Sequence, residues 1–312
     1  MGGMGLPGYQ ALRESSAWID LRGRGKILAR GEDRARLLHA LTTNHIEELT
    51  PGRGCYAFFL NAQGHILGDA NIFCMEELFL LDTEPETASK LYAHIDKHII
   101  ADDVTLEDST QHVATVAVEG PTSAATLGAL GAPIPDAEYA HVAWGTRIVC
   151  HVSTTGSGGF LIFLPSEEKA GLTSELEAAG AVYCDEACAR TVRIENGVPR
   201  YGDDFTEANL PQETGIARAL HFNKGCYLGQ EIVERIRSRG HVNRCLVRLE
   251  IDAGEVPATG AVLFDGENEA GYITSAVLSP VSGKVVAFAY VDPVNSRRGT
   301  RLALGGASAT VV

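Results

Sequence analysis

The stretch Lys-Ile-Leu-Ala-Arg-Gly-Glu-Asp-Arg-Ala-Arg-Leu-Leu-His-Ala-Leu at residues 26–41 shows the unit from which the first half of the chain is built. The apolar residues at its start predict a strand, and Gly31 predicts a turn. The leucines at 37, 38 and 41 predict a helix, because they recur on one helical face. Asp33 stands where a helix N-cap is expected. The same order of strand, glycine turn and helix returns at residues 113–130, so the sequence predicts two copies of one α+β unit.

Each copy also contains a predicted β-hairpin and a second predicted helix. The hairpin strands are residues 55–61 with 65–73 and residues 146–154 with 160–164, and the helices are about 85–99 and 166–179. Two degenerate repeats of this kind, at about 20–110 and 111–190, predict a duplicated α+β body of ferredoxin-like lobes. A cleft between the two copies is a natural place for a ligand.

The rest of the chain has a different pattern. From residue 190 to about 240 the sequence is polar and dotted with glycine, and it links the repeats to the C-terminal part of the chain. Short alternating runs then succeed one another with no helix signal, which predicts an antiparallel β-barrel. We therefore expect a region of two intertwined α+β lobes at 1–240 and a C-terminal barrel at 241–312.

Composition limits the classes of function. The 312 residues include 26 Lys and Arg against 40 Asp and Glu, a net charge of −14, and this field repels the phosphates of nucleic acid. No run approaches the roughly 20 apolar residues needed to cross a bilayer, and residues 1–10 lack the features of a signal segment. We expect a cytoplasmic protein without a membrane partner, whose seven cysteines are reduced.

Two residue pairs resemble metal ligands but are assigned to other roles. His94 and His98 lie four apart on a predicted helix, which places both on one side, yet no further ligand accompanies them. Their expected place is a solvated flank of the helix. Cys184 and Cys188 have the same spacing without a second pair. No metal site is predicted.

The stretch Lys-Gly-Cys-Tyr-Leu-Gly-Gln-Glu at 224–231 stands apart from the repeats. Lys224 and the arginines from 235 onward would stabilise a thiolate at Cys226, and the nearby glycines leave its sulfur approachable. Cys226 is therefore a candidate catalytic thiol, with Lys224 poising it. The alternative is a buried cysteine at a turn, beside a solvated arginine face.

This stretch resembles the signature of the YgfZ family, folate-binding proteins related to the T-protein (aminomethyltransferase) of the glycine cleavage system. Supporting stretches include Val118-Glu119-Gly120-Pro121 and Arg193-Ile194-Glu195-Asn196-Gly197. The resemblance implies GcvT-type lobes around a central folate channel, with tetrahydrofolate or a one-carbon derivative as cofactor. It also implies a role in assembling or repairing iron–sulfur clusters in client proteins, including enzymes that modify tRNA.

The resemblance also assigns several site residues. Glu195 matches the glutamate that holds the pterin in T-proteins, since a carboxylate can accept two hydrogen bonds from the pterin edge. The alternative for Glu195 is a solvated loop carboxylate. The other residues that the resemblance assigns to folate are Tyr227, Gly229, Gln230, Glu231 and Arg237.

Asp69 is the third candidate catalytic residue. T-proteins carry an acidic pair after the first hairpin, whereas this chain has Leu67-Gly68-Asp69 and retains one carboxylate. The resemblance therefore favours an iron–sulfur assembly factor over a turnover enzyme. A tetrahydrofolate-dependent aminomethyltransferase is the alternative and needs acid–base chemistry at Asp69. A tRNA-binding module is a third reading, and it needs a local basic groove.

Overall fold

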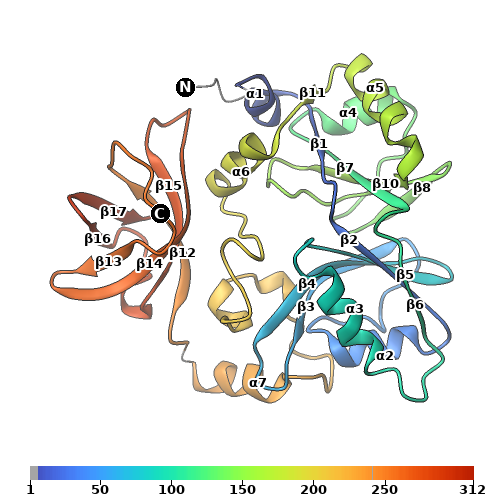
Figure 1. Cartoon of the computed structure of the whole chain (residues 1–312), viewed down its shortest axis with the longest axis horizontal. Coiled ribbons are helices and arrows are strands. Elements are labelled where there is room, and N and C mark those ends of the chain that lie inside the picture. The colour runs from blue at the N-terminus through green and yellow to red at the C-terminus, as the bar shows by residue number, and fades with distance from the viewer. Residues whose placement is uncertain (1–5, 241) are drawn as a thin grey trace.

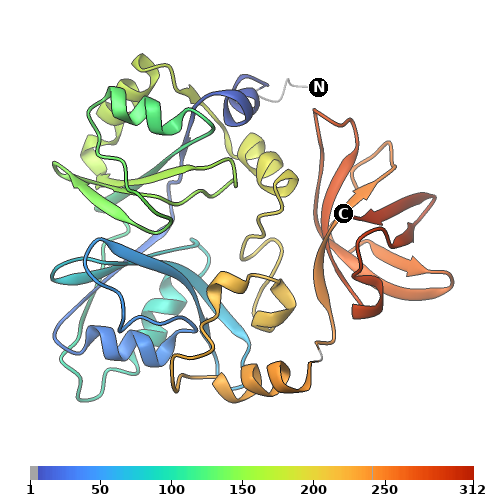
Figure 2. The same ribbon diagram turned by 180° about the vertical axis from the view of Figure 1, so that it is seen from behind.

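The computed structural model describes residues 6–240 and 242–312, which form two α+β lobes and a closed β-barrel (Figure 1). The lobes lie against each other and the barrel stands to one side of both. The chain after α6 (Glu186–Glu195) runs between the barrel and the two lobes, as the view from behind also shows (Figure 2). The predicted α+β class with a C-terminal barrel is confirmed. Within the described residues, no helix is both long and apolar enough to cross a membrane.

The first lobe is an antiparallel five-stranded sheet with two helices on one face. Its strands, in the order β3-β4-β5-β2-β6, are β3 (Arg53–Leu60), β4 (Ile66–Cys74), β5 (Leu78–Thr83), β2 (Gly25–Arg30) and β6 (Thr105–Asp108), and its helices are α2 (Arg34–Leu41) and α3 (Ala88–Asp96). α3 is shorter than the helix predicted at 85–99, because the Thr87 N–H closes a turn onto the Glu84 carbonyl at 3.0 Å. His94, predicted on a solvated flank, is buried against Phe59 instead.

The second lobe has a six-stranded sheet that includes a strand from before the first lobe. Its strands, in the order β11-β1-β7-β10-β9-β8, are β11 (Val182–Tyr183), β1 (Ala17–Asp20), β7 (Val113–Glu119), β10 (Gly159–Pro165), β9 (Arg147–Cys150) and β8 (His141–Trp144). The helices around it are α1 (Leu6–Glu14), α4 (Ser123–Ala129), η1 (Ser166–Glu168), α5 (Lys169–Ala178) and α6.

Side-chain alternation gives the five-stranded sheet two different faces. Along β3, Ala57 and Phe59 join the core under α2 and α3. Tyr56 and Phe58 belong to a second core, which both lobes share. Polar residues on this second face therefore point toward the space between the lobes.

The turn between β2 and α2 depends on a glycine. Gly31 has a φ of 103°, and a Cβ there would lie 1.9 Å from the Asp103 carbonyl oxygen. Asp33 occupies the N-cap position of α2, as the sequence predicts, but its side chain makes no capping hydrogen bond. Its carboxylate accepts a hydrogen bond from the Asp103 N–H at 2.8 Å, so the turn is held from residues 102–104 rather than from the helix.

We expect Gly31→Ala to lower the free energy of unfolding by more than about 1 kcal/mol, because alanine disfavours positive φ and its methyl group would overlap the Asp103 carbonyl. Urea unfolding of the variant checks this. The control is Gly128→Ala within α4, where no described atom lies within 4 Å of the new Cβ. Alanine favours a helix, so this control is expected to gain up to about 1 kcal/mol. Equal stabilities of the two variants would contradict the argument.

A helix that the sequence did not reveal comes after the lobes. α7 (Gln230–Arg239) begins after Gly229 and lies along the first lobe (Figures 1 and 2). Only Ile232, Val233 and Ile236 are apolar among its 10 residues, so no helical stripe stands out in the sequence. Two short 3-10 helices, η2 (Pro211–Thr214) and η3 (Ala217–Ala219), precede it.

The barrel closes through a strand that was not predicted. Its strands and one 3-10 helix are β12 (Cys245–Ile251), β13 (Val262–Asp265), β14 (Asn268–Leu278), β15 (Val285–Val291), η4 (Pro293–Asn295), β16 (Arg301–Leu304) and β17 (Ala307–Val311). β17 pairs with both β12 and β16 and so completes the ring. Asp204 joins the barrel to the lobes, since its buried carboxylate accepts hydrogen bonds from Arg193, Thr274 and Ser275.

Candidate functional site

A cavity of about 380 Å³ lies between the two lobes. The first lobe contributes polar residues of β3 and β4, and the second contributes the loop 152–155. Residues of α6 and of the chain after it complete the wall. Because the two sheets supply facing walls, the cavity lies where the duplication of the α+β unit predicts a ligand.

Asp69 projects from β4 into this cavity. Tyr56 stands diagonally across from it on β3, where Phe58 is the residue directly paired with Asp69. The Tyr56 hydroxyl donates a hydrogen bond of 2.6 Å to Asp69 Oδ2. Asp69 Oδ1 is buried and has no hydrogen-bond partner among the described residues. One carboxyl oxygen is thus held in place while the other is free for a ligand.

The environment of Asp69 raises its pKa to about 7. Burial is the largest cause, and the negative charge of Glu84 is the second. The hydrogen bond from Tyr56 and the positive charge of Arg24 oppose the shift. Near neutral pH the carboxyl group is therefore partly protonated and can both donate and accept a proton.

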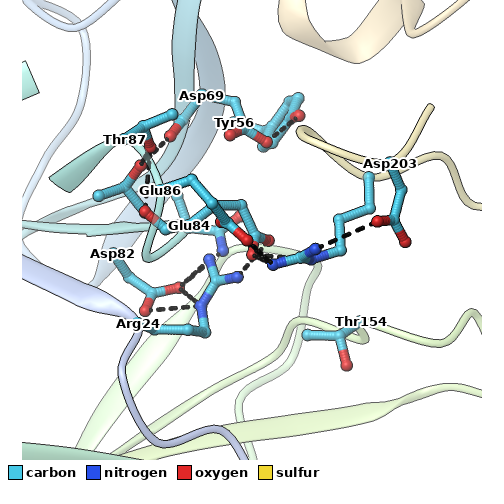
Figure 3. A network of polar contacts seen from close by, with 12 residues as sticks. Arg24, Tyr56, Asp69, Asp82, Glu84, Glu86, Thr87, Thr154 and Asp203 are labelled. Carbon is cyan, nitrogen blue, oxygen red and sulfur yellow. Dashed lines mark hydrogen bonds and ion pairs between the residues drawn. The ribbon is translucent and has the colours of Figure 1, made fainter. Parts of the chain in front are cut away.

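A chain of ion pairs lies beside Asp69 (Figure 3). Arg24 contacts Asp82 at 2.7 Å and Glu84 at 2.5 Å, and Arg200 holds the other oxygen of Glu84 at 2.8 Å. Glu84 is thus fixed between two guanidinium groups from distant parts of the chain. No sequence pattern indicates this arrangement, since Arg24 and Arg200 lie in irregular segments without any motif.

Gly68 replaces one member of the acidic pair of T-proteins, but a side chain at position 68 would not point into the cavity. Gly68 precedes Asp69 on β4, and neighbouring residues of a strand point to opposite faces. A Cβ at position 68 would lie 3.0 Å from the Thr87 Cβ, on the side of α3. The prediction that Gly68 deprives the site of a proton-transfer group is therefore wrong in its structural premise.

Glu119 fixes the opposite wall of the cavity. Its fully buried carboxylate accepts hydrogen bonds from the Thr154 N–H at 2.6 Å, the Thr155 N–H at 3.0 Å and the Ser153 hydroxyl at 2.7 Å. These contacts hold the loop 153–155 against the cavity. In the sequence, Glu119 stands within a stretch that supports the family resemblance, and no pattern there indicates this role.

Glu195 lies at the end of α6 and is not among the residues that line the cavity. The Tyr9 hydroxyl lies 2.8 and 2.9 Å from its two carboxylate oxygens, and Arg13 lies at 3.3 Å. Burial and the contact with Glu195 raise the pKa of Tyr9 to about 12. These contacts direct the carboxylate toward α1, and its predicted contact with a pterin stays a prediction.

Lys224 directs its ammonium group toward α2. Nζ donates hydrogen bonds of 2.5 Å to the carbonyl oxygens of His39 and Thr42, at the C-terminal end of that helix. A positive charge there satisfies unpaired carbonyl groups and complements the helix dipole. Burial lowers the pKa of Lys224 to about 7. The contacts therefore give Lys224 a structural role beside the predicted one at Cys226.

The remaining residues of 224–231 lie outside the cavity wall. Cys226 is exposed, and the Tyr227 N–H donates to Gln230 Oε1 at 3.3 Å. Gly229 has a φ of 84°, and a Cβ there would lie 2.7 Å from the Asn61 carbonyl oxygen. Tight packing of this turn on the first hairpin thus accounts for Gly229. None of these residues is brought to Asp69.

The last two residues predicted to contact folate belong to α7. Glu231 is exposed and lies 3.5 Å from Arg235. Arg237 is also exposed, and its guanidinium group stacks over the ring of Phe222 at 4.4 Å. Both residues lie outside the cavity wall, and their folate contacts stay predictions.

Comparison with known proteins identifies the family of the chain. Residues 7–224 match the GCVT N-terminal domain, and residues 244–311 match the glycine cleavage T-protein C-terminal barrel domain. The aminomethyltransferase of Rubrobacter xylanophilus is 30% identical over 298 residues, which cover 91% of this chain and 78% of that protein. The aminomethyltransferase of Streptomyces coelicolor is 30% identical over 308 residues, which cover 94% and 82%.

A solved structure shows the same fold. Glycine cleavage system aminomethyltransferase T from Bartonella henselae superposes with a TM-score of 0.90 at 23% identity, covering 98% of this chain and 87% of that one. At this identity the likeness concerns the fold alone.

These findings correct the functional prediction. The expected role in iron–sulfur assembly is contradicted, because similar proteins that cover most of the chain are named aminomethyltransferases. Iron–sulfur client proteins and tRNA-modifying enzymes lose their support as partners, whereas a folate cofactor agrees with the family. The matches to both domains place this chain in the glycine cleavage T-protein family.

Proposed function

We propose that the protein is a tetrahydrofolate-dependent aminomethyltransferase in which Asp69 is the acid–base group. The observation that carries this proposal is the buried Asp69 carboxyl group, which lines the cavity. Its Oδ1 has no hydrogen-bond partner among the described residues, and its pKa is raised to about 7. The names of the relatives supply the type of reaction. A group poised near neutral pH suits acid–base catalysis, since both of its protonation states are populated.

The residues of the cavity fit a reduced folate. Its volume of about 380 Å³ lies in the range of small-molecule sites. Asp69 Oδ1 is an acceptor without a partner and suits an N–H group of the pterin. The phenol groups of Tyr56 and Tyr139 supply apolar ring surface. When bound, the folate supplies the amine nitrogens that take up the one-carbon unit.

Asp69 would move protons at both ends of the transfer. An amine leaves the aminomethyl carbon as a neutral molecule only if a proton reaches its nitrogen, and protonated Asp69 can supply that proton. The first folate nitrogen that bonds to the carbon would lose a proton, which the resulting carboxylate can accept. Asp69 is thereby restored, while Tyr56 keeps its second oxygen in place throughout. In the methylene product the carbon is also bonded to a second folate nitrogen, whose proton would go to the thiolate that leaves an S-aminomethyl donor as its C–S bond breaks.

The test is the production of methylene-tetrahydrofolate from an aminomethyl donor by the purified chain. Turnover that requires tetrahydrofolate and saturates with both substrates supports the proposal. If the protein binds tetrahydrofolate but releases no one-carbon unit above the uncatalysed rate, the proposal is wrong.

We expect kcat/KM to fall as the pH rises through about 7, because the first proton transfer requires protonated Asp69. A pH profile of the transfer reaction measures this. A profile that is flat between pH 6 and 8, with a fully active enzyme, would assign the proton transfer to another group.

The domain bounds, the finer family assignment, the cellular location and the role of Cys226 remain part of the proposal. We retain the division into 1–240 and 241–312; residues 1–5 and 241 lie outside the described residues. The resemblance of 224–231 to the YgfZ branch and the cytoplasmic location also remain predictions. So does the Cys226 thiol, although the cluster chemistry for which it was singled out no longer has support.

A further inference from the structure

Arg218 differs from the other arginines of the cavity wall. Arg24 and Arg200 are bound to carboxylates at 2.5–2.8 Å, and Arg193 lies 3.0 Å from Asp203. Within residues 6–240 and 242–312, no carboxylate forms an ion pair with Arg218. The charge of Glu138 acts on Arg218 without forming an ion pair with it, so the guanidinium group can still pair with the carboxylate of a ligand.

The backbone around Arg218 is fixed to β3. The Asn44 side-chain amide donates hydrogen bonds of 2.9 Å to the carbonyl oxygens of both Tyr56 and Arg218. The Thr43 hydroxyl donates to the Ala219 carbonyl at 2.6 Å. These bonds hold η3 (Ala217–Ala219) beside β3, so Arg218 has a defined position at the cavity.

The guanidinium group of Arg218 also has a defined orientation. It stacks over the ring of Tyr56, 5.2 Å from the centroid. The hydroxyl of the same ring holds Asp69 Oδ2. Stacking keeps a guanidinium group in one plane. Apart from its contact with the Tyr139 hydroxyl, the Arg218 group therefore has N–H groups available at its edge. An exposed cation that no described carboxylate pairs with is thus held one aromatic ring away from the proposed acid–base group.

We infer that Arg218 is a binding residue that anchors a carboxylate of the one-carbon substrates. A planar guanidinium group binds a carboxylate through two parallel hydrogen bonds, and such bonds are both strong and directional. This carboxylate comes either from the glutamyl tail of the folate or from the amine donor. The inference rests on the proposed function and adds how a substrate is oriented toward Asp69.

The test compares the purified chain with Arg218→Gln, using two folates and two donors. The folates are tetrahydrofolate and its diamide, in which both glutamyl carboxylates are primary amides, and affinity is measured by calorimetry. The donors are the S-aminomethyl derivatives of 3-mercaptopropionate and of its amide, and KM is measured in the transfer assay. Losing a charge-assisted pair is expected to weaken the charged ligand about tenfold to a hundredfold.

A loss confined to tetrahydrofolate, with diamide affinity unchanged, assigns the carboxylate to the folate tail. A rise in KM confined to the mercaptopropionate donor assigns it to the donor. The matched control is Arg147→Gln, because Arg147 also stacks on an aromatic ring, Trp144, but is already paired with Glu175 and lies outside the cavity. This control should change neither the two folate affinities nor the two donor KM values.

The experiment distinguishes a failure of the Arg218 anchor from a failure of the proposed function. If the unmodified chain transfers a one-carbon unit and Arg218→Gln retains all four values, the anchor is overturned and the proposed function stands. If the unmodified chain neither binds tetrahydrofolate nor turns over, the proposed function is overturned and the anchor falls with it.

Discussion

Asp69→Asn is expected to lower aminomethyl transfer by about 10²–10⁴-fold, the usual contribution of one acid–base group. Asparagine keeps the size of the side chain, and its oxygen can still accept the hydrogen bond from Tyr56. Its NH2 group cannot accept from a pterin N–H, so tetrahydrofolate should still bind but with affinity lowered by the loss of about one hydrogen bond. Single-turnover rates and folate calorimetry on the same preparation measure both effects. A loss of folate affinity as large as the loss of activity would show a binding role instead of a proton-transfer role.

The matched control for this variant is Asp102→Asn. Asp102 is also a largely buried carboxylate, paired with Arg36 at 2.5 Å, but it lies outside the cavity wall. Its replacement should leave the transfer rate unchanged. A comparable loss in both variants would indicate a general structural effect.

The same substitution of Asp69 is expected to stabilise the folded chain above pH 7. Burial raises the pKa of Asp69 from 3.8 to about 7, so between these values the folded state holds the proton more tightly than the unfolded state. Stability therefore falls as the pH rises through this window. An amide carries no charge to bury, so the variant loses this decline. Urea unfolding at pH 5 and pH 8 measures the difference, and an equal change at both values would argue against the raised pKa.

Asp82→Ala is expected to lower the free energy of unfolding by about 3–5 kcal/mol, the usual cost of leaving a buried charge without its partner. Asp82 is fully buried and accepts hydrogen bonds from the Nε and Nη2 atoms of Arg24, as well as from the Asn71 amide. Its removal leaves Arg24 with Glu84, which Arg200 also binds. Denaturant unfolding of the variant gives the loss directly.

The control for this variant is Asp136→Ala, which removes an exposed ion pair of 3.0 Å with Arg53. An exposed pair contributes about 0–1 kcal/mol, so this change should be nearly neutral. A neutral Asp82→Ala would mean that Arg24 finds another partner or becomes hydrated when the carboxylate is lost.

Much of the fold could be predicted because it depends on local patterns. The strand, glycine turn and helix at 26–41 recur at 113–130, and alternation marks the barrel strands. Elements with weak patterns escaped prediction. α7 has few apolar residues, and β17 is made of small ones, so both depend on neighbours that are distant in sequence.

The site also depends on contacts between residues that are distant in sequence, and these leave no local pattern. Asp69 could be singled out from one hairpin. Glu84 meets Arg24 only when β2 and β5 pair, and it meets Arg200 only when the chain after α6 packs against the first lobe. Lys224 has a second role that its sequence neighbours do not indicate. Its sequence neighbour Cys226 suggested thiol chemistry, whereas the carbonyl groups of α2, far away in sequence, take its ammonium group.

The place of β1 in the second lobe affects how the protein is made on the ribosome. Ala17 pairs with Glu119 on one side and with Val182 on the other, and both partners are synthesised much later. The five-stranded sheet needs only residues 25–108 and can assemble first. A nascent chain therefore carries β1 unpaired until translation reaches β7, and one edge of β1 stays without its partner until β11 is made. The first lobe can therefore fold during synthesis while the second lobe still lacks β11, and in that interval the free edge of β1 can pair with other strands.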